Sequence, residues 1–203
     1  MILNIESVSK TYDEKTILND FSLTMDERER IAILGASGQG KTTLLRLILG
    51  LTAADGGTVS TADKLHILVV FQEDRLLMQF NALENLNVYP QPFNKEEACE
   101  LLSRLGLGEA ALSKKAASEY SGGMRRRLAM ARALYGCLST RHSFPDEPLL
   151  LVMDEPFKGL DVLLKEKVIE TVDEVLKATG CALLMVTHDE KEAAALGCSL
   201  ISI

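Results

Sequence analysis

Long apolar runs and tryptophan are both missing from this sequence of 203 residues. A helix that crosses a bilayer needs about 20 consecutive apolar residues, and the sequence has no comparable run. The first residues, Met1–Glu6, lack the basic start and the long apolar segment of a secretion signal. We therefore expect no membrane-spanning helix and a location in the cytoplasm.

Cysteine is also scarce, and its four residues are scattered along the chain at positions 99, 137, 181 and 198. Zinc sites and disulfide frameworks use closely or regularly spaced cysteines, so this spacing argues against both. We expect the four side chains to behave as small buried apolar groups in a reducing compartment.

Positive charge is in the minority: the sequence has 22 lysines and arginines and 29 acidic residues, which gives a net charge of −7. This balance disfavours wholesale binding to nucleic acid or anionic lipid, although a local basic patch is compatible with it. The hydrophobic fraction of 47% is that of an ordinary soluble protein. A chain of this length forms one sizeable core, and we expect one domain with an appendage.

Three glycines, by contrast, stand close together in the stretch Gly35-Ala36-Ser37-Gly38-Gln39-Gly40-Lys41-Thr42. This stretch fits the G-x-x-x-x-G-K-[ST] phosphate-binding loop at every fixed position. A short apolar strand precedes it at 30–34, and apolar residues at helical spacing follow it at 42–49. Glycines let consecutive backbone N–H groups converge on an anion, and the helix N-terminus adds unpaired donors. We expect Lys41 to contact phosphates and the Thr42 hydroxyl to bind Mg²⁺.

The remaining pattern predicts an α/β fold with a mostly parallel sheet, an N-terminal antiparallel β region and an inserted helical subdomain. We expect the nucleotide-binding core to comprise 1–74 and 149–203, and the helical subdomain to comprise 75–148. The expected strands are 2–8, 17–25, 30–34, 57–60, 66–71, 149–153, 182–187 and 199–203. The expected helices are 42–49, 81–86, 95–106, 108–114, 121–134, 161–177 and 190–196, with a polar loop at 139–148.

Polar side chains follow three of the expected buried strands. Asp154 and Glu155 come after the strand 149–153, Gln72 after 66–71, and His188 after 182–187. Open α/β sheets bind ligands at the carboxyl ends of their strands. One acid there can hold Mg²⁺ while its neighbour orients or deprotonates a water, and the histidine can reach a γ-phosphate.

A second anion-ready helix start is Ser121-Gly122-Gly123. Taken alone, the alternative is a plain serine N-cap with a turn. Arg125, Arg126 and Arg127 follow at once, and positive charges at the positive end of a helix are unfavourable in isolation. We expect a solvated basic face here rather than direct phosphate contact by any one of the three.

Tyr12 lies in the turn between the first two expected strands, 23 residues before Gly35. An exposed aromatic ring there can stack on a flat base. Packing of the ring on the sheet face is the equal alternative.

Taken together, these pieces resemble the ATP-binding subunit of an ATP-binding cassette (ABC) transporter, over essentially the whole chain. The elements occur in the family's order: Tyr12, the loop 35–42 with Thr43, Gln72, Ser121-Gly122-Gly123, Asp154-Glu155, Leu160-Asp161 and His188. A set of this length in one order is far harder to obtain by chance than any single motif.

The resemblance implies a P-loop NTPase core with ATP and Mg²⁺ as cofactors. In this family Tyr12 would stack on adenine, and the loop with Thr43 would wrap the β- and γ-phosphates. Mg²⁺ would be held by Thr42, Gln72 and Asp154. Glu155 would polarise the attacking water and His188 would sense the γ-phosphate, so the catalytic set is Lys41, Gln72, Glu155 and His188. Asp161 joins the nucleotide-binding set.

The resemblance also implies partners. Ser121, Gly122 and Gly123 form the family's signature and would close over the ATP of a second copy in a head-to-tail dimer. Separate transmembrane permease subunits, and a substrate-binding protein in an importer, would complete the assembly on the inner face of the cell membrane, with no nucleic acid partner. Two alternatives remain: a cassette acting on DNA or the ribosome, although the long or zinc-binding insertions of such relatives are missing, and a nucleotide-gated interaction module with little hydrolysis.

The segments 70–77 and 81–85 are similar, more narrowly, to cassettes of the nitrate, sulfonate and taurine importer group. Several residues depart from the family pattern. The signature is flanked by Tyr120 and Met124 in place of leucine and glutamine, and Lys158-Gly159 replaces serine-alanine. Gln39 is bulkier than the usual loop residue. These departures are expected to affect turnover. The chain resembles a minimal cassette without an added regulatory domain.

Overall fold

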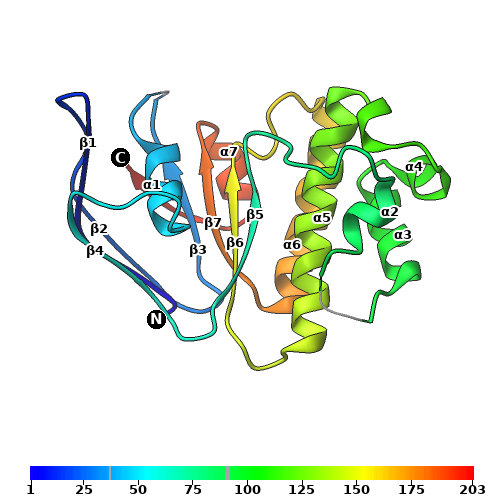
Figure 1. Cartoon of the computed structure of the whole chain (residues 1–203), viewed down its shortest axis with the longest axis horizontal. Helices are drawn as coiled ribbons and strands as arrows, with labels where there is room; N and C mark the ends of the chain where they lie inside the picture. Colours follow the sequence, from blue (N-terminus) through cyan, green and yellow to red (C-terminus); the bar gives the residue numbers. More distant parts are fainter. Residues whose placement is uncertain (37, 90–91) are drawn as a thin grey trace.

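The computed structural model describes residues 1–36, 38–89 and 92–203, and is organised around a five-stranded parallel sheet (Figure 1). The strands lie in the order β5 (His66–Val70), β6 (Leu149–Asp154), β7 (Ala182–Thr187), β3 (Arg30–Leu34) and β8 (Ser199–Ser202). Every residue of β6 and β7 is buried. Their continuous apolar sequence is explained by cover on both faces of the sheet.

A second sheet of three antiparallel strands stands beside the first. Its order is β2 (Lys15–Met25), β1 (Leu3–Tyr12) and β4 (Gly56–Thr61). Asp13 and Glu14 form the hairpin turn with positive φ angles of 46° and 65°, the conformation that matches the twist of paired strands. Tyr12 is therefore the last residue of β1, opposite Lys15, and lies just before the turn rather than in it.

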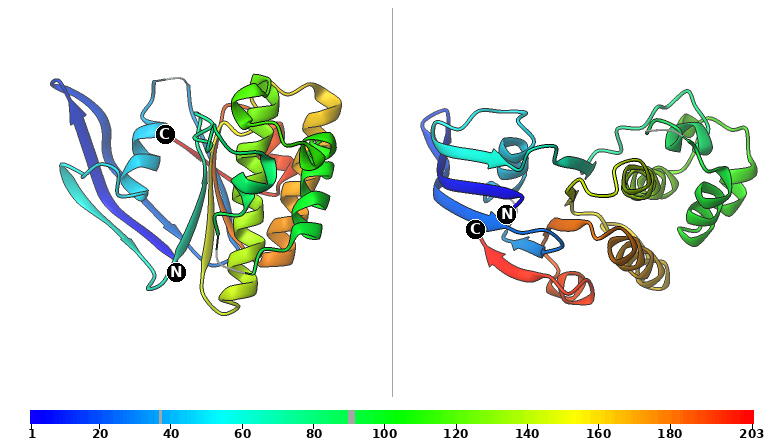
Figure 2. Two further views of the ribbon diagram at one scale, coloured as in Figure 1. Left: turned by 45° about the vertical axis from the view of Figure 1, so that its right-hand side comes forward. Right: turned by 90° about the horizontal axis from the view of Figure 1, so that it is seen from below.

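Helix α1 (Lys41–Ile48) fills the space between the two sheets (Figure 2). Its buried residues, among them Leu44 and Leu47, join one apolar cluster with Ile5 of β1, Ile33 of β3 and Val152 of β6. This packing fixes the start of α1 against the end of β3, where the glycine-rich loop connects them.

The opposite face of the parallel sheet is covered by α5 (Gly122–Ser143), α6 (Val162–Thr179) and α7 (Glu190–Ala195). Outside α5 lie α2 (Ala82–Leu86), α3 (Lys95–Arg104), α4 (Gly108–Leu112) and the 3-10 turn η1 (Ala117–Glu119) (Figure 2). A second apolar cluster joins Leu102 of α3 and Leu128 of α5 to Leu151 of β6. The helical segment thus shares one core with this face of the sheet.

The structure confirms the predicted α/β fold, including the antiparallel N-terminal region and the inserted helices. The polar loop expected at 139–148 is wrong in part, because α5 continues to Ser143. This last part of the helix lacks an apolar stripe, but Thr140 is buried and Arg141 Nε donates a hydrogen bond to the Thr179 carbonyl at 2.7 Å. Tertiary contacts extend the helix where its own pattern does not.

Across the described part of the chain, no helix combines the length and the apolar character that crossing a bilayer requires.

Candidate nucleotide-binding site

The glycine-rich loop connects β3 to α1, and Gly40 is its last residue before the helix. Gly40 has a φ of +93°, and a Cβ there would lie 2.8 Å from the Ile17 carbonyl oxygen. Only glycine fits both conditions. Ser37 of the predicted loop lies outside the described residues.

Lys41 lies under the loop with 6% of its surface exposed. Its Nζ donates hydrogen bonds to the carbonyl oxygens of Gly35 at 2.5 Å and Ala36 at 2.9 Å. The ammonium is therefore held inside the curve of the loop. The bulkier side chain of Gln39 also folds back, and its Oε1 accepts a hydrogen bond from the Ala36 N–H.

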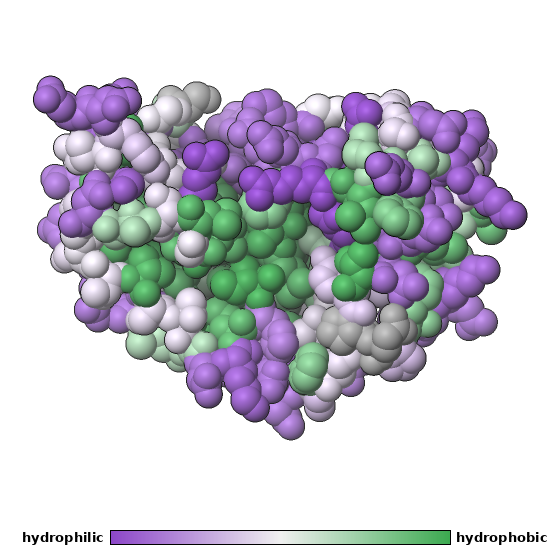
Figure 3. All heavy atoms as spheres, in the orientation of Figure 1, coloured by the Kyte–Doolittle hydropathy of each residue, from purple (hydrophilic) through white to green (hydrophobic). Residues whose placement is uncertain are grey.

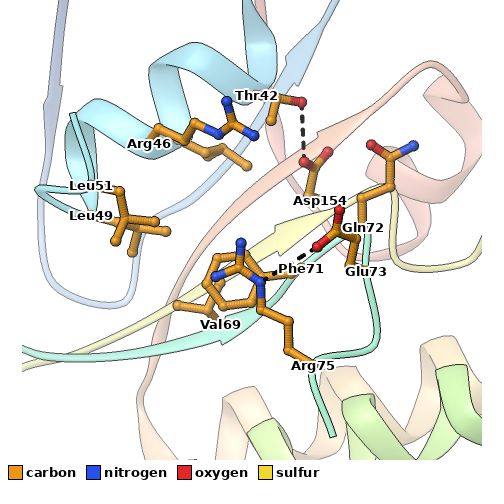
Figure 4. Close-up of a pocket in the computed structure, with 11 residues that line it drawn as sticks. Thr42, Arg46, Leu49, Leu51, Val69, Phe71, Gln72, Glu73, Arg75 and Asp154 are labelled. Atoms are coloured by element: carbon orange, nitrogen blue, oxygen red, sulfur yellow. Dashed lines mark hydrogen bonds and ion pairs between the residues drawn. The ribbon is translucent and has the colours of Figure 1, made fainter.

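Thr42, at the start of α1, and Asp154, at the end of β6, face each other across the site (Figure 4). The Thr42 Oγ1 donates a hydrogen bond to Asp154 Oδ2 at 3.2 Å. Burial raises the pKa of Asp154, and the Thr42 hydrogen bond opposes this shift. A cation between the two side chains would stabilise the buried carboxylate.

The donor set fits Mg²⁺, which prefers hard oxygen ligands. The Gln72 side chain, two residues after β5, lines the same cavity as Thr42 and Asp154. A hydroxyl, a carboxylate and an amide oxygen are thus available to one ion. When bound, Mg²⁺ would neutralise phosphate charge at this position.

Glu155 follows at the edge of the site with a φ of +45°, which is unusual for a residue other than glycine. His188 Nδ1 lies 3.4 Å from its Oε1, and Lys158 Nζ lies 2.9 Å from its Oε2. Interaction with Lys158 is the main cause of a lowered pKa for Glu155, and His188 adds to it. The carboxylate is therefore ionised at neutral pH and can act as a base or orient a water.

A cavity of about 320 Å³ joins these groups to the antiparallel sheet. Its lining includes Tyr12, Lys41, Thr43, Glu155 and Lys158. The Tyr12 side chain is 42% exposed, and the Lys10 ammonium lies 5.2 Å from its ring centroid. The ring is thus not packed on the sheet face and is open to a ligand on the cavity side.

Three predicted site residues on the helical segment do not join this cavity. Ser121, Gly122 and Gly123 are exposed at the start of α5, and Ser121 Oγ accepts a hydrogen bond from the Met124 N–H at 3.2 Å. Within its own chain Ser121 is therefore a plain N-cap. Asp161 likewise caps α6, accepting a hydrogen bond from the Leu164 N–H at 3.0 Å.

The prediction of a solvated basic face at the start of α5 is wrong for Arg126. This side chain is buried, with 8% of its surface exposed, and contacts the ends of β5 and β6 rather than solvent. Three consecutive arginines in the sequence gave no sign of which one turns inward. Helical spacing does not select it either, because residues 128–131 are all buried and each of the three arginines therefore has buried residues three and four positions later.

A glycine-rich loop between a strand and a helix, with an acid from the end of another parallel strand beside the helix's first threonine, defines a P-loop nucleotide-binding protein. The chain belongs to the ABC transporter family, whose sequence model matches residues 18–158. Members of this family bind ATP with Mg²⁺ and hydrolyse it.

Several similar curated proteins are named as import ATP-binding proteins. The chain is 34% identical to the aliphatic sulfonates import ATP-binding protein SsuB of Cupriavidus necator, in an alignment that covers 99% of this chain and 65% of that protein. It is 37% identical to SsuB 1 of Rhodococcus jostii, covering 96% of this chain and 76% of that one. The chain thus spans about two thirds of the length of the first of these relatives.

Among solved structures, the chain is similar to the ATP-binding cassette MJ0796, in a dimeric post-hydrolysis state bound to ADP and Pi. The TM-score is 0.80 at 27% identity, and the alignment covers 100% of this chain and 94% of that one. The P-loop NTPase fold predicted from the sequence is therefore confirmed.

Proposed function

We propose that this chain is the ATP-hydrolysing subunit of an ABC importer. Two copies bind two Mg-ATP between them, and closing and reopening of this dimer drives separate permease subunits at the inner face of the membrane. In this function the core, 1–74 and 149–203, binds and hydrolyses the nucleotide. The helical segment, 75–148, carries the signature residues that contact the ATP of the second copy.

One observation carries the enzymatic part of the proposal: Lys41 and Thr42 at the start of α1 and Asp154 and Glu155 at the end of β6 converge on one cavity. A phosphate-binding lysine, an oxygen pair suited to Mg²⁺ and an ionised glutamate are the parts that ATP hydrolysis requires. We assign Tyr12, which lines the cavity, to stacking on the base, and His188, which lies beside Glu155, to contact with the γ-phosphate.

The glycines of the signature support the dimer. A Cβ added to Gly122 or Gly123 would meet no heavy atom within 4 Å. Neither glycine has a positive φ angle, so their own chain does not require glycine at either position. A close approach by another molecule does explain them, and the phosphates of an ATP bound to a second copy are the approach that we propose.

An apolar hollow supports the permease contact. Figure 3 shows apolar side chains gathered in a hollow beside α1 and β5. Leu49, Leu51, Val69 and Phe71 line a pocket there together with Gln72, and the Arg75 guanidinium stacks over Phe71 at 3.8 Å (Figure 4). We assign this hollow to a cytoplasmic helix of the permease, because such a contact would reach Gln72 directly.

The transported solute is chosen by the permease and its substrate-binding protein. Because relatives are named as importers of aliphatic sulfonates, we propose a small organic anion of this kind. Transport assays in vesicles that hold this chain together with its permease would test the choice.

The experiment that tests the proposed function is Glu155→Gln in saturating Mg-ATP. The variant should bind ATP, keep only a small residual hydrolysis and accumulate as an ATP-bound dimer measured by size-exclusion chromatography with light scattering. Lys41→Ala is the matched control, because without its ammonium the chain should neither bind nor dimerise. A Glu155→Gln variant that binds ATP and stays monomeric would overturn the dimer mechanism.

A second candidate function, a nucleotide-gated switch with little hydrolysis, is favoured by the ion pair of Lys158 with Glu155. In that case the unaltered chain itself should form the ATP-bound dimer and keep its nucleotide intact for hours. Steady turnover by the unaltered chain would exclude the switch.

A further inference from the structure

Arg126 lies on the first turns of α5, five residues after the signature serine, and its side chain runs inward under the nucleotide cavity. It is one of few charged side chains in the described core, with 8% of its surface exposed. A charge at this depth requires compensation, because removal from water penalises the ionised guanidinium. Burial lowers the pKa of Arg126, and the nearby carboxylates of Asp74, Asp154 and Glu155 oppose the shift.

The compensation consists of four backbone carbonyl groups at the carboxyl ends of two neighbouring strands. Nη1 donates to the carbonyl oxygens of Phe71 at 2.5 Å and Gln72 at 2.8 Å, after β5. Nη2 donates to those of Asp154 at 2.9 Å and Glu155 at 2.6 Å, at the end of β6. One planar fork therefore joins the two segments that carry Gln72 and Glu155, and only arginine offers donors in this arrangement.

The Glu155 end of this contact is conformationally strained. A φ of +45° places the residue in the left-handed region, which persists in a non-glycine residue only where its surroundings hold it. Its backbone makes three hydrogen bonds: the Glu155 N–H donates to the Val186 carbonyl at 2.9 Å, and the Glu155 carbonyl accepts from Arg126 at 2.6 Å and from the Lys158 N–H at the longer distance of 3.4 Å. The direction of the Glu155 carboxylate follows from this backbone conformation.

We propose that Arg126 is a positioning residue, which fixes the backbone of Gln72 and Glu155 together and so aims the Glu155 carboxylate at the reacting water. The inference rests on the proposed ATP hydrolysis, and it makes α5 a mechanical link from the signature at its N-terminus to the catalytic turn. Arg126 acts through these carbonyls and does not touch the nucleotide.

Steady-state kinetics provides the first test. Arg126→Lys keeps the charge but cannot reach all four carbonyls, and it should lower kcat about 100-fold, as expected for a misplaced catalytic group. KM for Mg-ATP should change less than about threefold, because binding contacts are retained. Arg132→Met is the matched control: Arg132 lies on the same helix and also donates to a backbone carbonyl, that of Arg75 at 2.8 Å, but it should keep full activity.

The double variant separates positioning from general structural damage. If Arg126 acts through Glu155, Arg126→Lys should lower the residual activity of Glu155→Gln by less than about twofold, since the group being aimed is already absent. A further loss of about 100-fold in that background, or normal kcat in folded Arg126→Lys, would overturn the proposal.

Amide hydrogen exchange tests the same contact without any activity. In Arg126→Lys and Arg126→Met, exchange should accelerate in segments 70–75 and 153–158 and remain as in the unaltered chain in α1 and α6. Unchanged exchange in both segments would overturn the proposal. If the unaltered chain hydrolyses no ATP, the proposed function fails while this measurement still decides whether Arg126 holds the two segments.

Discussion

The ammonium of Lys158 lies 2.9 Å from Oε2 of Glu155 and forms an ion pair with it. This oxygen is shielded from solvent and has no well-aligned hydrogen-bond donor among the described residues. A serine at position 158, as in the family pattern that the sequence resembles, could not form this ion pair. The ion pair lowers the pKa of Glu155, whereas burial raises it. The Lys158 ammonium also competes with any water that the carboxylate would orient.

Lys158→Ser should raise the pKa of Glu155, because Lys158 is the main cause of its lowered value. A carboxylate with a lowered pKa stays ionised until the pH falls below its ordinary range. Without Lys158, protonation begins at higher pH, so the acid limb of the pH–activity profile should move upward. Because the Lys158 side chain is 59% exposed, high salt should produce a similar shift in the unaltered chain.

The control for this variant is Lys177→Ser, which removes another mostly exposed lysine, paired with Asp173 on the far part of α6. Its pH–activity profile should match that of the unaltered chain. An acid limb that stays in place in Lys158→Ser would show that the ion pair does not govern Glu155 in the working enzyme.

Tyr12→Ala should weaken Mg-ATP binding about 10-fold or more, because stacking of a base on an aromatic ring contributes about 1–3 kcal/mol. Tyr12→Phe keeps the ring and should bind ATP normally. Inorganic tripolyphosphate has no base, and its affinity should be the same in all three proteins. Calorimetry with both ligands checks this, and equal losses for ATP and tripolyphosphate would contradict stacking by Tyr12.

Gly123→Ala should leave the isolated chain at least as stable as before, since the added Cβ meets no atom within 4 Å and alanine favours a helix over glycine by up to about 1 kcal/mol. The same methyl group would stand against the phosphates bound by a second copy. ATP-driven dimerisation in the Glu155→Gln background should therefore be lost. Dimerisation with unchanged affinity would show that the signature glycines do not meet a partner's nucleotide.

Local patterns were enough to predict the strand, loop and helix at 30–49, because hydrophobic period and glycine spacing are set by neighbours in the chain. The proximity of Asp154 to Thr42 followed from a rule of sheet topology, since carboxyl ends of parallel strands meet at one edge. Arg126 could not be predicted in this way. Its partners lie 54 and 55 residues earlier and 28 and 29 residues later, and only the packing of α5 across β5 and β6 selects it among three arginines.

The end of α5 could not be predicted from local sequence either. Residues 139–143 carry no apolar stripe, and their helix depends on contacts such as that of Arg141 with the Thr179 carbonyl. The positive φ of Glu155 is likewise invisible in the sequence. Local preference disfavours it, and it persists because long-range hydrogen bonds hold it.

Asp154→Asn should separate the stability of the chain from its need for Mg²⁺. Burial raises the pKa of Asp154, so the folded chain holds this proton more tightly than the unfolded chain does. Binding of this proton therefore stabilises the folded chain. The stabilisation is fully present below the ordinary aspartate pKa and is lost as the pH rises through the raised pKa of the folded chain. At neutral pH the neutral asparagine avoids this loss, and the melting temperature of the nucleotide-free chain should rise by on the order of 2 °C.

Half-maximal ATPase activity of Asp154→Asn should nevertheless need at least about 10-fold more Mg²⁺. Thermal melting without ligand and Mg²⁺ titration of activity check the two halves, and an unchanged Mg²⁺ requirement would remove Asp154 from the metal site.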